Sequence, residues 1–380
     1  MRRPFTALLM AAALLPAGLA HADVTSAAET VEVVANLRGA MPTGVTVAAN
    51  GRIFLNYPQW GDNPSFGVGE LRNGKVYAYP DAATSATSTA DPEHHFVSVQ
   101  SVVADANNRL WVLDTGAPGF SRPVPGGAKL VAIDLATDKI VRTIAFGRDV
   151  LLDTTYLNDV RFDLTQGKAG VAYITDSSIK GPGGLIVVDL ASGKALRRLS
   201  GHPSTMPDKD FAASVGGEVL MNRPKGEAPT PWLVATDGIA ISPDGATLYY
   251  CALSSRHFYA VPTALLRDPA ISDAVIANNI RDLGPKAPSD GLAEDDTGAI
   301  YAGDYENGSI LRFKNGRWTT IASDDRILWP DTLSIGTDHY LYFTANQLFR
   351  QAGFHEGRDE RKQPYQLLRI KVGAGPVLLK

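Results

Sequence analysis

An all-β fold, a six-bladed β-propeller with four-stranded antiparallel blades around a central channel, is predicted for this 380-residue chain by two observations. The first is a hairpin pattern in which two apolar runs of period two are joined by an Asp, Asn or Gly turn. Its six copies span residues 44–56, 101–114, 158–176, 237–253, 290–304 and 331–346. The second is that helix signals are few, while 36 Gly and 24 Pro are spread along the chain. The recurrence of the hairpin pattern is typical of radial repetition and not of one irregular core.

The segments between these hairpins supply the outer strands. Three further pairs of apolar runs are each joined by a short turn, and they span residues 129–134 with 139–144, 184–189 with 195–199, and 309–313 with 318–321. The early run Val31–Asn36 and the late run Tyr365–Val372 have no such neighbour. We expect them to pair with each other and close the ring, because closure removes exposed sheet edges.

A few segments depart from the strand pattern. One short helical turn is expected at Ala264–Arg267 and another at Pro207–Ala213. The stretches 82–92 and 201–231 are rich in loop-forming residues, and we expect them to cross one face of the propeller.

Composition restricts the class of protein. The chain is 44% hydrophobic and 20% charged with a net charge of -4, so it can bury a large core and does not resemble a nucleic-acid or membrane-surface binder. Residues 1–22 have the pattern of a signal peptide: Arg2 and Arg3 precede the apolar run 5–19, and cleavage is expected after Ala22. Residues 23–380 are then expected to form one propeller domain, periplasmic or secreted, with no membrane insertion after cleavage. Composition does not indicate the oligomeric state.

Polar residues recur at corresponding positions of the hairpins. Inner strands of a propeller line the channel and the next strands return antiparallel, so the start of each first strand and the end of each second strand share one face. The residues at these positions are Asn158, Asp159, Asp237, Asp290, Asp331 and, at strand ends, Asp114, Asp176, Asp304 and Asn346. We expect a ring of carboxylates and amides around one mouth of the channel, where a small-molecule ligand would bind.

Oxygen ligands from several elements are what Ca²⁺ and other hard divalent cations prefer. The alternative is that Asp and Asn are good turn residues that precede strands. The candidate metal ligands are Asn158, Asp237 and Asp290, and the candidate catalytic residues are Asp237 and Asp290.

Several stretches resemble the yellow/major royal jelly protein family. They read RLWVLDTG, YLNDVRFD, AYITDSS, GLIVVDLASGKALRRLSGHPSTMPD, GIAISPDGATLYYCALSSRHFYAVPTALLRD and PTGVTVAANGRIFLNYPQW, and they follow the family's order over nearly the whole chain. The resemblance implies a six-bladed propeller whose channel holds small ligands. It also implies a choice of functions, since relatives include dopachrome-converting proteins, binders of biogenic amines and nutritional proteins. Insect members carry cysteines near the second and third hairpins, whereas this chain has Asn108 before RLWVLDTG and a single cysteine, Cys251, inside an apolar strand.

The strand-start acids are also similar to those of the gluconolactonases, regucalcin and paraoxonases. In that group Asn and Asp at strand starts hold a catalytic divalent metal, and Asn158, Asp237 and Asp290 match those positions. The first-blade Glu of those enzymes is replaced by Thr43 in the segment PTGV.

Three functions therefore remain open. The first is an exported protein that binds, or also converts, a small molecule at the channel mouth, with a dopachrome-type proton shift as the conversion. The second is a divalent-metal-dependent lactonase or esterase, in which the metal polarises a carbonyl and a carboxylate takes a proton. The third is a non-catalytic secreted interaction protein, which a channel plugged by apolar side chains would favour.

Aromatic residues near the mouth of the channel are candidates to enclose a small aromatic or cationic ligand: Tyr57, Trp60, Tyr305 and Phe343. Aromatic residues in such positions more often pack in the core or between blades. The pair His94 and His95 lies in a polar loop and is a weaker candidate, because adjacent residues of an extended chain point in opposite directions. The chain has no CxxC pair, HExxH motif, GxSxG elbow or phosphate-binding glycine loop, which disfavours the corresponding enzyme classes.

Overall fold

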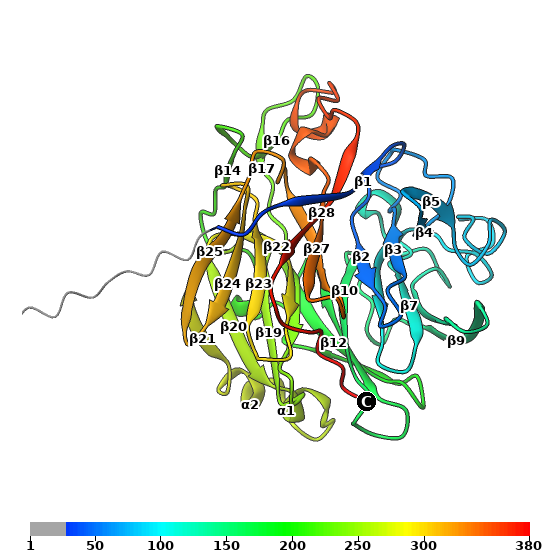
Figure 1. The fold of residues 1–380 in the computed structure, drawn as a ribbon. Coiled ribbons are helices and arrows are strands. Elements are labelled where there is room, and N and C mark those ends of the chain that lie inside the picture. The colour runs from blue at the N-terminus through cyan, green and yellow to red at the C-terminus, as the bar shows by residue number, and fades with distance from the viewer. Residues whose placement is uncertain (1–27) are drawn as a thin grey trace, which may run out of the picture.

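Six four-stranded antiparallel sheets form a closed ring in the computed structural model, which describes residues 28–380 (Figure 1). The predicted signal peptide, residues 1–22, lies outside the described residues. Within the described part, no helix is long and apolar enough to cross a membrane. The β-propeller prediction is confirmed.

The first three blades follow the chain order from the channel outward. Blade 1 contains β2 (Val45–Val47), β3 (Ile53–Asn56), β4 (Val68–Arg72) and β5 (Lys75–Ala78). Blade 2 contains β6 (Val99–Ala104), β7 (Arg109–Asp114), β8 (Lys129–Asp134) and β9 (Lys139–Ala145). Blade 3 contains β10 (Leu157–Asp163), β11 (Val171–Asp176), β12 (Gly184–Asp189) and β13 (Ala195–Arg198). All six repeated hairpins of the sequence are the innermost strand pairs of the blades.

The other three blades include the closure. Blade 4 contains β18 (Thr236–Ile241), β19 (Thr247–Ala252), β20 (His257–Pro262) and β21 (Arg281–Pro285). Blade 5 contains β22 (Ser289–Glu294), β23 (Ile300–Asp304), β24 (Ser309–Lys314) and β25 (Arg317–Ser323). Blade 6 contains β26 (Pro330–Ile335), β27 (Tyr340–Ala345), β28 (Tyr365–Lys371) and, outermost, β1 (Glu32–Leu37). Glu32 lies opposite Arg369 and Leu37 opposite Tyr365, so the predicted closure by the two distant runs is confirmed.

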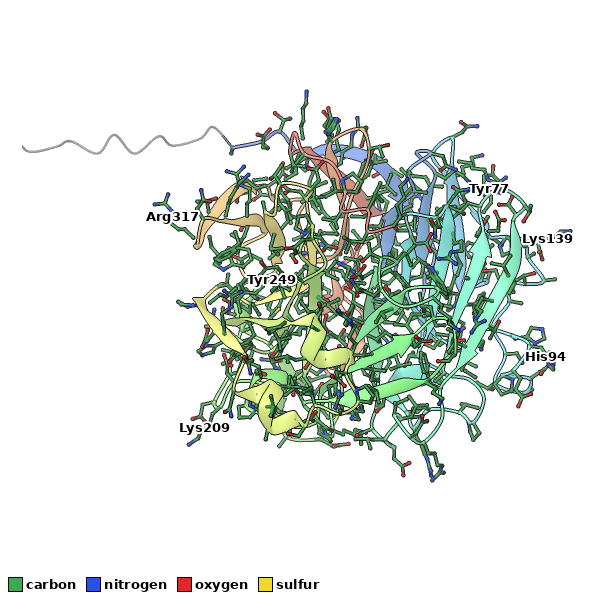
Figure 2. The ribbon with its side chains drawn as sticks, turned by 90° about the horizontal axis from the view of Figure 1, so that it is seen from below. Tyr77, His94, Lys139, Lys209, Tyr249 and Arg317 are labelled. Carbon is green, nitrogen blue, oxygen red and sulfur yellow. The ribbon has the colours of Figure 1, made fainter. Side chains whose placement is uncertain are left out.

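Apolar layers lie between neighbouring blades and hold the ring together. Between blades 2 and 3, for example, Trp111 stacks on Phe162 with ring centroids 5.1 Å apart. The outermost strands carry exposed side chains, and Figure 2 shows Tyr77 of β5, Lys139 of β9 and Arg317 of β25 at the rim of the molecule. Both faces of an inner strand are covered, so every residue of β10 and β18 is buried, the polar residues included.

Two short helices, α1 (Thr263–Arg267) and α2 (Asp273–Ala277), connect β20 to β21. The first matches the predicted turn at 264–267, whereas the helical turn predicted at 207–213 is wrong. In that segment the Asp208 carboxylate accepts hydrogen bonds from Ser255 Oγ at 2.7 Å and Arg256 N at 2.6 Å. These tertiary contacts hold the backbone in a turn instead of a helix.

One end of the channel is covered by two long connections. The link between blades 3 and 4 contains the short hairpins β14 (Ser214–Val215) with β15 (Glu218–Val219) and β16 (Met221–Asn222) with β17 (Thr230–Pro231). The link between β27 and β28 runs over residues 346–364 and meets the first where Arg223 N donates to Gly353 O and Glu356 N donates to Arg223 O, both at 2.9 Å. Both connections lie at the top of Figure 1. They form one wall of the candidate site.

Candidate functional site

The innermost strands share one irregularity at the covered end of the channel. In blades 3 to 6 the register between the first and second strands shifts within residues 157–160, 236–239, 289–292 and 330–333. Blade 2 has the same shift between Val99 and Ser101. Such bulges bend a strand and redirect its side chains. The bulged residues include Gln100, Asn158, Asp237, Asp290 and Asp331, so one local distortion, repeated around the ring, turns these side chains toward the channel.

The glycines that follow two of these acids have a steric role. A Cβ on Gly238 would lie 2.6 Å from the carbonyl oxygen of Asp290, and a Cβ on Gly291 would lie 2.6 Å from that of Asp331. Neighbouring inner strands therefore approach more closely than any side-chain-bearing residue would allow. The pairs Asp237-Gly238 and Asp290-Gly291 therefore serve the packing of inner strands and do not form hairpin turns.

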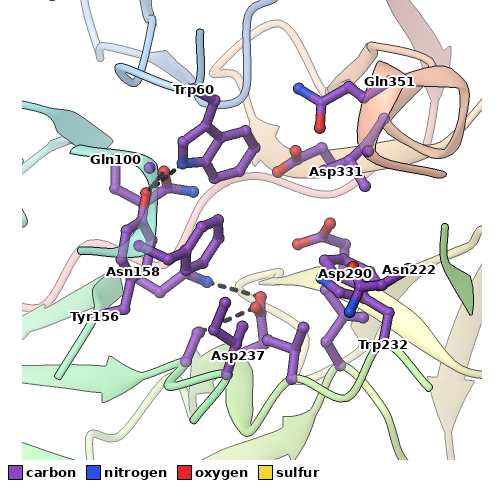
Figure 3. Close-up of a pocket in the computed structure, with 18 of the residues that line it drawn as sticks. Trp60, Gln100, Tyr156, Asn158, Asn222, Trp232, Asp237, Asp290, Asp331 and Gln351 are labelled. Carbon is purple, nitrogen blue, oxygen red and sulfur yellow. Dashed lines mark hydrogen bonds between the residues drawn. The ribbon is translucent and has the colours of Figure 1, made fainter. Parts of the chain in front are cut away.

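The redirected side chains form the floor of a pocket of about 240 Å³. Asp237, Asp290 and Asp331 are 4%, 6% and 4% exposed, and Figure 3 shows their carboxyl groups directed into the same space. Asn158 and Gln100 complete the floor. No Lys, Arg or His is found among the described residues that line the pocket.

Each floor carboxylate accepts hydrogen bonds from neutral donors. Asn158 Nδ2 donates to Asp237 Oδ1 at 2.7 Å and Ser177 Oγ donates to Asp237 Oδ2 at 3.0 Å. Trp329 Nε1 donates to Asp290 Oδ2, and Asn346 Nδ2 donates to Asp331 Oδ2, both at 2.7 Å. These donors hold the carboxyl groups in place, but they do not neutralise a full negative charge.

Burial and mutual repulsion change the titration of the floor. Burial, together with the charges of Asp290 and Asp159, raises the pKa of Asp237 well above its usual value. Burial raises the pKa of Asp290 to about 6, although hydrogen bonds from Trp329 and Asp237 oppose the shift. Burial and the charges of Asp290 and Asp159 likewise raise the pKa of Asp331. Burial and mutual repulsion therefore favour protonation of these floor carboxyl groups over full ionisation.

Asp159 adds negative charge from below the pocket. It is buried and lies outside the pocket lining, one residue further along β10 than Asn158. Burial raises its pKa, and the charge of Arg161 opposes that shift. Arg161 is itself held by Glu294 at 3.2 Å and by the carbonyl oxygen of Val160. It is therefore shared among several partners and does not neutralise the floor.

Aromatic side chains form the walls. Phe120 stacks on Tyr156 with centroids 4.0 Å apart and on Trp60 at 5.3 Å. Trp60 Nε1 donates to the Tyr156 hydroxyl at 2.8 Å, and that hydroxyl donates to Gln100 Oε1 at 2.9 Å. On the opposite side Trp232 packs edge-on against Phe354 at 5.2 Å. Aromatic walls above an acidic floor are a combination suited to a flat or cationic ligand.

The structure brings together some predicted site residues and not others. Asn158, Asp237, Asp290 and Asp331 line the pocket, and Asn346 contacts it through Asp331. Three of the strand-end acids are not brought to it: Asp114, Asp176 and Asp304.

Each of these three acids is occupied by donors of its own blade. Asp114 accepts from the backbone N–H groups of Val97 and Ser98 and from Lys129 Nζ at 2.7, 2.9 and 3.0 Å. Asp176 pairs with Arg197 at 2.7 Å, and Asp304 accepts from Asn307 Nδ2 at 2.8 Å. These contacts give the three acids a structural role that fixes the ends of their blades.

The predicted aromatic set needs a similar correction. Of the four candidates only Trp60 lines the pocket. Tyr305 stacks on Trp329 at 4.3 Å below the floor, Phe343 is fully buried between blades, and Tyr57 lies in a different groove. Sequence reasoning missed Phe120, Tyr156, Trp232 and Phe354. Tyr156 directly precedes the sequence LND at the start of β10. Its position in the repeat could therefore have indicated it as a site residue.

The floor also bears on the predicted metal. The floor atoms that could bind a metal ion are all oxygens, the ligand type that hard divalent cations prefer. Among residues 28–380, however, no three His, Cys, Asp or Glu side chains are arranged to hold a metal ion. A cation here would therefore need the amide oxygen of Asn158 besides the carboxylates of Asp237 and Asp290.

The raised pKa of Asp290 predicts an unusual stability profile. A carboxyl group with a raised folded-state pKa stabilises the fold below its unfolded pKa, and this contribution is lost as pH rises through about 6. We expect Asp290→Asn, which keeps an acceptor for Trp329, to raise the free energy of unfolding at pH 8 by about 3 kcal/mol. The gain should disappear near pH 4. Thermal unfolding at both pH values measures it, with the exposed Asp325→Asn as control, and a variant less stable than the parent at pH 8 would contradict the analysis.

Comparison with solved structures supports the fold. The chain superposes on a luciferin-regenerating enzyme with a TM-score of 0.56 at 13% identity, covering 93% of this chain and 99% of the other. A calcium-binding protein, regucalcin, from Agrobacterium tumefaciens gives 0.54 at 14% identity, with coverages of 93% and 98%. A gluconolactonase from Xanthomonas campestris gives 0.52 at 14% identity, with coverages of 90% and 89%. At these identities the likeness concerns the fold alone.

Comparison of sequences goes further. Protein yellow of Drosophila subobscura is 28% identical over 247 residues, which are 60% of this chain and 40% of that protein. Major royal jelly protein 7 of Apis mellifera is 27% identical over 174 residues, or 44% of this chain and 35% of that one. The matched part thus spans less than half the length of either relative. The family model described as major royal jelly protein matches residues 97–374, and the chain therefore belongs to the major royal jelly protein family.

Proposed function

We propose that this protein binds a small organic cation with a flat ring in the pocket at the covered mouth of its channel. The observation that carries the proposal is an acidic floor of three buried carboxyl groups below aromatic walls, with no cationic side chain in the lining. An ammonium group above Asp237, Asp290 and Asp331 would supply the missing positive charge. The ring would lie against Trp60, Phe120 or Trp232.

The pocket is polar at its floor and open to a ligand, which weakens the case for a purely structural interaction protein. Such a role was expected if apolar side chains plugged the channel. The lining instead contains Gln100, Asn158, Asn222 and Gln351 besides the acids. Amide groups of this kind orient a bound molecule by hydrogen bonds.

Binding of 2-phenylethylamine tests the proposal. We expect a complex that quenches tryptophan fluorescence, because Trp60 and Trp232 line the pocket. The neutral isostere 2-phenylethanol should bind at least about tenfold more weakly, since the charge-assisted hydrogen bond is lost. Affinity for the amine should fall as pH drops through about 6, where Asp290 becomes protonated.

Variants of the site sharpen this test. Asp237→Asn and Asp331→Asn should each weaken amine binding about tenfold or more, whereas the exposed Asp325→Asn should not change it. Equal binding of the alcohol and the amine would contradict cation recognition. Chromatography of the same samples tests for conversion, and a product formed only with intact Asp237 and Asp290 would support a proton-transfer reaction.

A second candidate is a divalent-metal-dependent lactonase or esterase. The oxygen-only floor favours it, and Asn158, Asp237 and Asp290 are the residues that would hold the cation. When bound, such a cation would polarise a lactone or ester carbonyl and acidify a water molecule. The Thr43 side chain stands where the related enzymes have Glu, and it is occupied by a 2.9 Å hydrogen bond from Asn56 Nδ2.

Thermal unfolding separates the two candidates. After treatment with EDTA, the protein is titrated with Ca²⁺, Mg²⁺, Mn²⁺ or Zn²⁺ and the Tm is recorded. A site of the metalloenzyme kind should stabilise the fold by about 2.7 kcal/mol at a metal concentration of 100 Kd, and Asp237→Asn should abolish this. No shift with any of the four metals would contradict the second candidate and leave the first unaffected.

We also infer that the protein is exported. The support is the signal-like pattern of residues 1–22, which lies outside the described residues. Expression of the full chain in a Gram-negative host should give a periplasmic or secreted product beginning at Asp23, and Edman sequencing of that product checks it. A cytoplasmic product that keeps Met1 would contradict the inference.

A further inference from the structure

A second groove, of opposite charge, lies on the outside of the ring where blade 6 meets blade 1. It has a volume of about 430 Å³ and separates the end of β1 from the β4–β5 hairpin, and we call it the β1–β5 groove. These elements lie near the top right of Figure 1. Its lining comes from three segments and one further residue: Asn36–Ala40, Pro64–Phe66, Gly74–Val76 and Tyr57.

Two cations face this groove without an acidic partner. Arg38 follows β1 and Lys75 begins β5, so they enter from opposite sides. Neither makes an ion pair within residues 28–380, and none of the described lining residues is Asp or Glu.

Neighbouring arginines behave differently. Arg52 binds Glu70 at 2.6 Å, Arg72 lies 3.5 Å from the same carboxylate, and Arg369 binds Glu32 at 2.8 Å. Acids are thus available on both blades and are used by other arginines. The two groove cations are left with uncompensated charge.

Tyr57 supplies a neutral donor at the inner end of the groove. Its side chain is 6% exposed and packs edge-on against Phe66, with ring centroids 5.5 Å apart. No described residue makes a hydrogen bond with its hydroxyl group, and burial alone raises its pKa. A phenol in such a position normally finds a partner when it is buried, so this hydroxyl is available to an incoming acceptor.

We propose that the β1–β5 groove binds a small organic anion with a flat apolar body. The apolar part would pack on Phe66, Leu37 and Val76. The anionic group, a carboxylate, sulfate or phosphate, would lie between Arg38 and Lys75 and accept a hydrogen bond from Tyr57. This site is separate from the acidic pocket, with which it shares no lining residue.

Titration calorimetry with 2-naphthoate tests the proposal on the intact chain. Arg38→Gln and Lys75→Gln should each weaken binding about two- to fivefold, as expected for exposed ion pairs, and the double variant about tenfold or more. Tyr57→Phe removes only the hydroxyl group and should weaken binding about threefold. Arg72→Gln, on the same hairpin but outside the lining, is the matched control and should bind as the parent does. The sulfate and phosphate esters of 2-naphthol show which anionic group is preferred.

Further arms separate this site from the acidic pocket. Asp237→Asn should leave naphthoate binding unchanged, and the neutral 2-naphthylmethanol should bind about tenfold more weakly than naphthoate. Absence of naphthoate binding at millimolar concentration would overturn the proposal. The proposal would also be overturned if the Arg38 and Lys75 variants bound naphthoate as the parent does, or if 2-naphthylmethanol bound as tightly as naphthoate. Failure of the amine experiment would leave this result unaffected, because the two tests use different probes and different variants.

Discussion

The close approach of inner strands at the covered end of the channel is the constraint on which the site depends. Bulges at corresponding positions turn side chains inward, and Gly238 and Gly291 let the next strand come within a distance that a Cβ would forbid. The acids that precede these glycines are therefore pressed toward one another by the geometry of the ring itself.

Such a floor is unfavourable for the protein in isolation. Buried carboxylates lose hydration, and each repels the others through a medium of low dielectric constant. Neutral donors such as Trp329 and Asn346 stabilise the groups only in part, and a shared proton relieves one charge at a time. The proposed function would account for the arrangement, because a group that is destabilised in the free protein is the one that gains most from a positively charged ligand.

The fold could be predicted from the sequence because its signals are local and repeated. Period-two apolar runs with Asn-Gly or Asp-Gly turns specify the hairpins, and six copies specify the ring. The floor acids at 237, 290 and 331 followed from their common position. Gln100 was missed because blade 2 has an amide where blades 4 to 6 have an acid. Gln100 nevertheless lies in the corresponding bulge of its strand.

Trp60 was predicted, but most of the wall residues could not be, because they come from connections that do not repeat. Phe120 lies in an irregular loop with a left-handed backbone, and Trp232 and Phe354 belong to the two long links. The roles of Asp114 and Asp176 depend on Lys129 and Arg197, which lie 15 and 21 residues further along. Tyr305, which follows β23, and Phe343, which lies within β27, show that an aromatic residue near a strand end packs in the core as readily as it lines a channel.

The closure of blade 6 has a consequence for how the protein reaches its native state. Arg369 lies opposite Glu32, so the last strand pairing joins segments 337 residues apart in the chain. During synthesis the β1 segment emerges first and has no partner until β28 has been made. A ring of this kind is a high-contact-order fold, in which the first blades form early and the final edge stays open longest. Until that edge is joined, β1 and β28 expose unpaired backbone to other chains, so aggregation competes with the last step of folding.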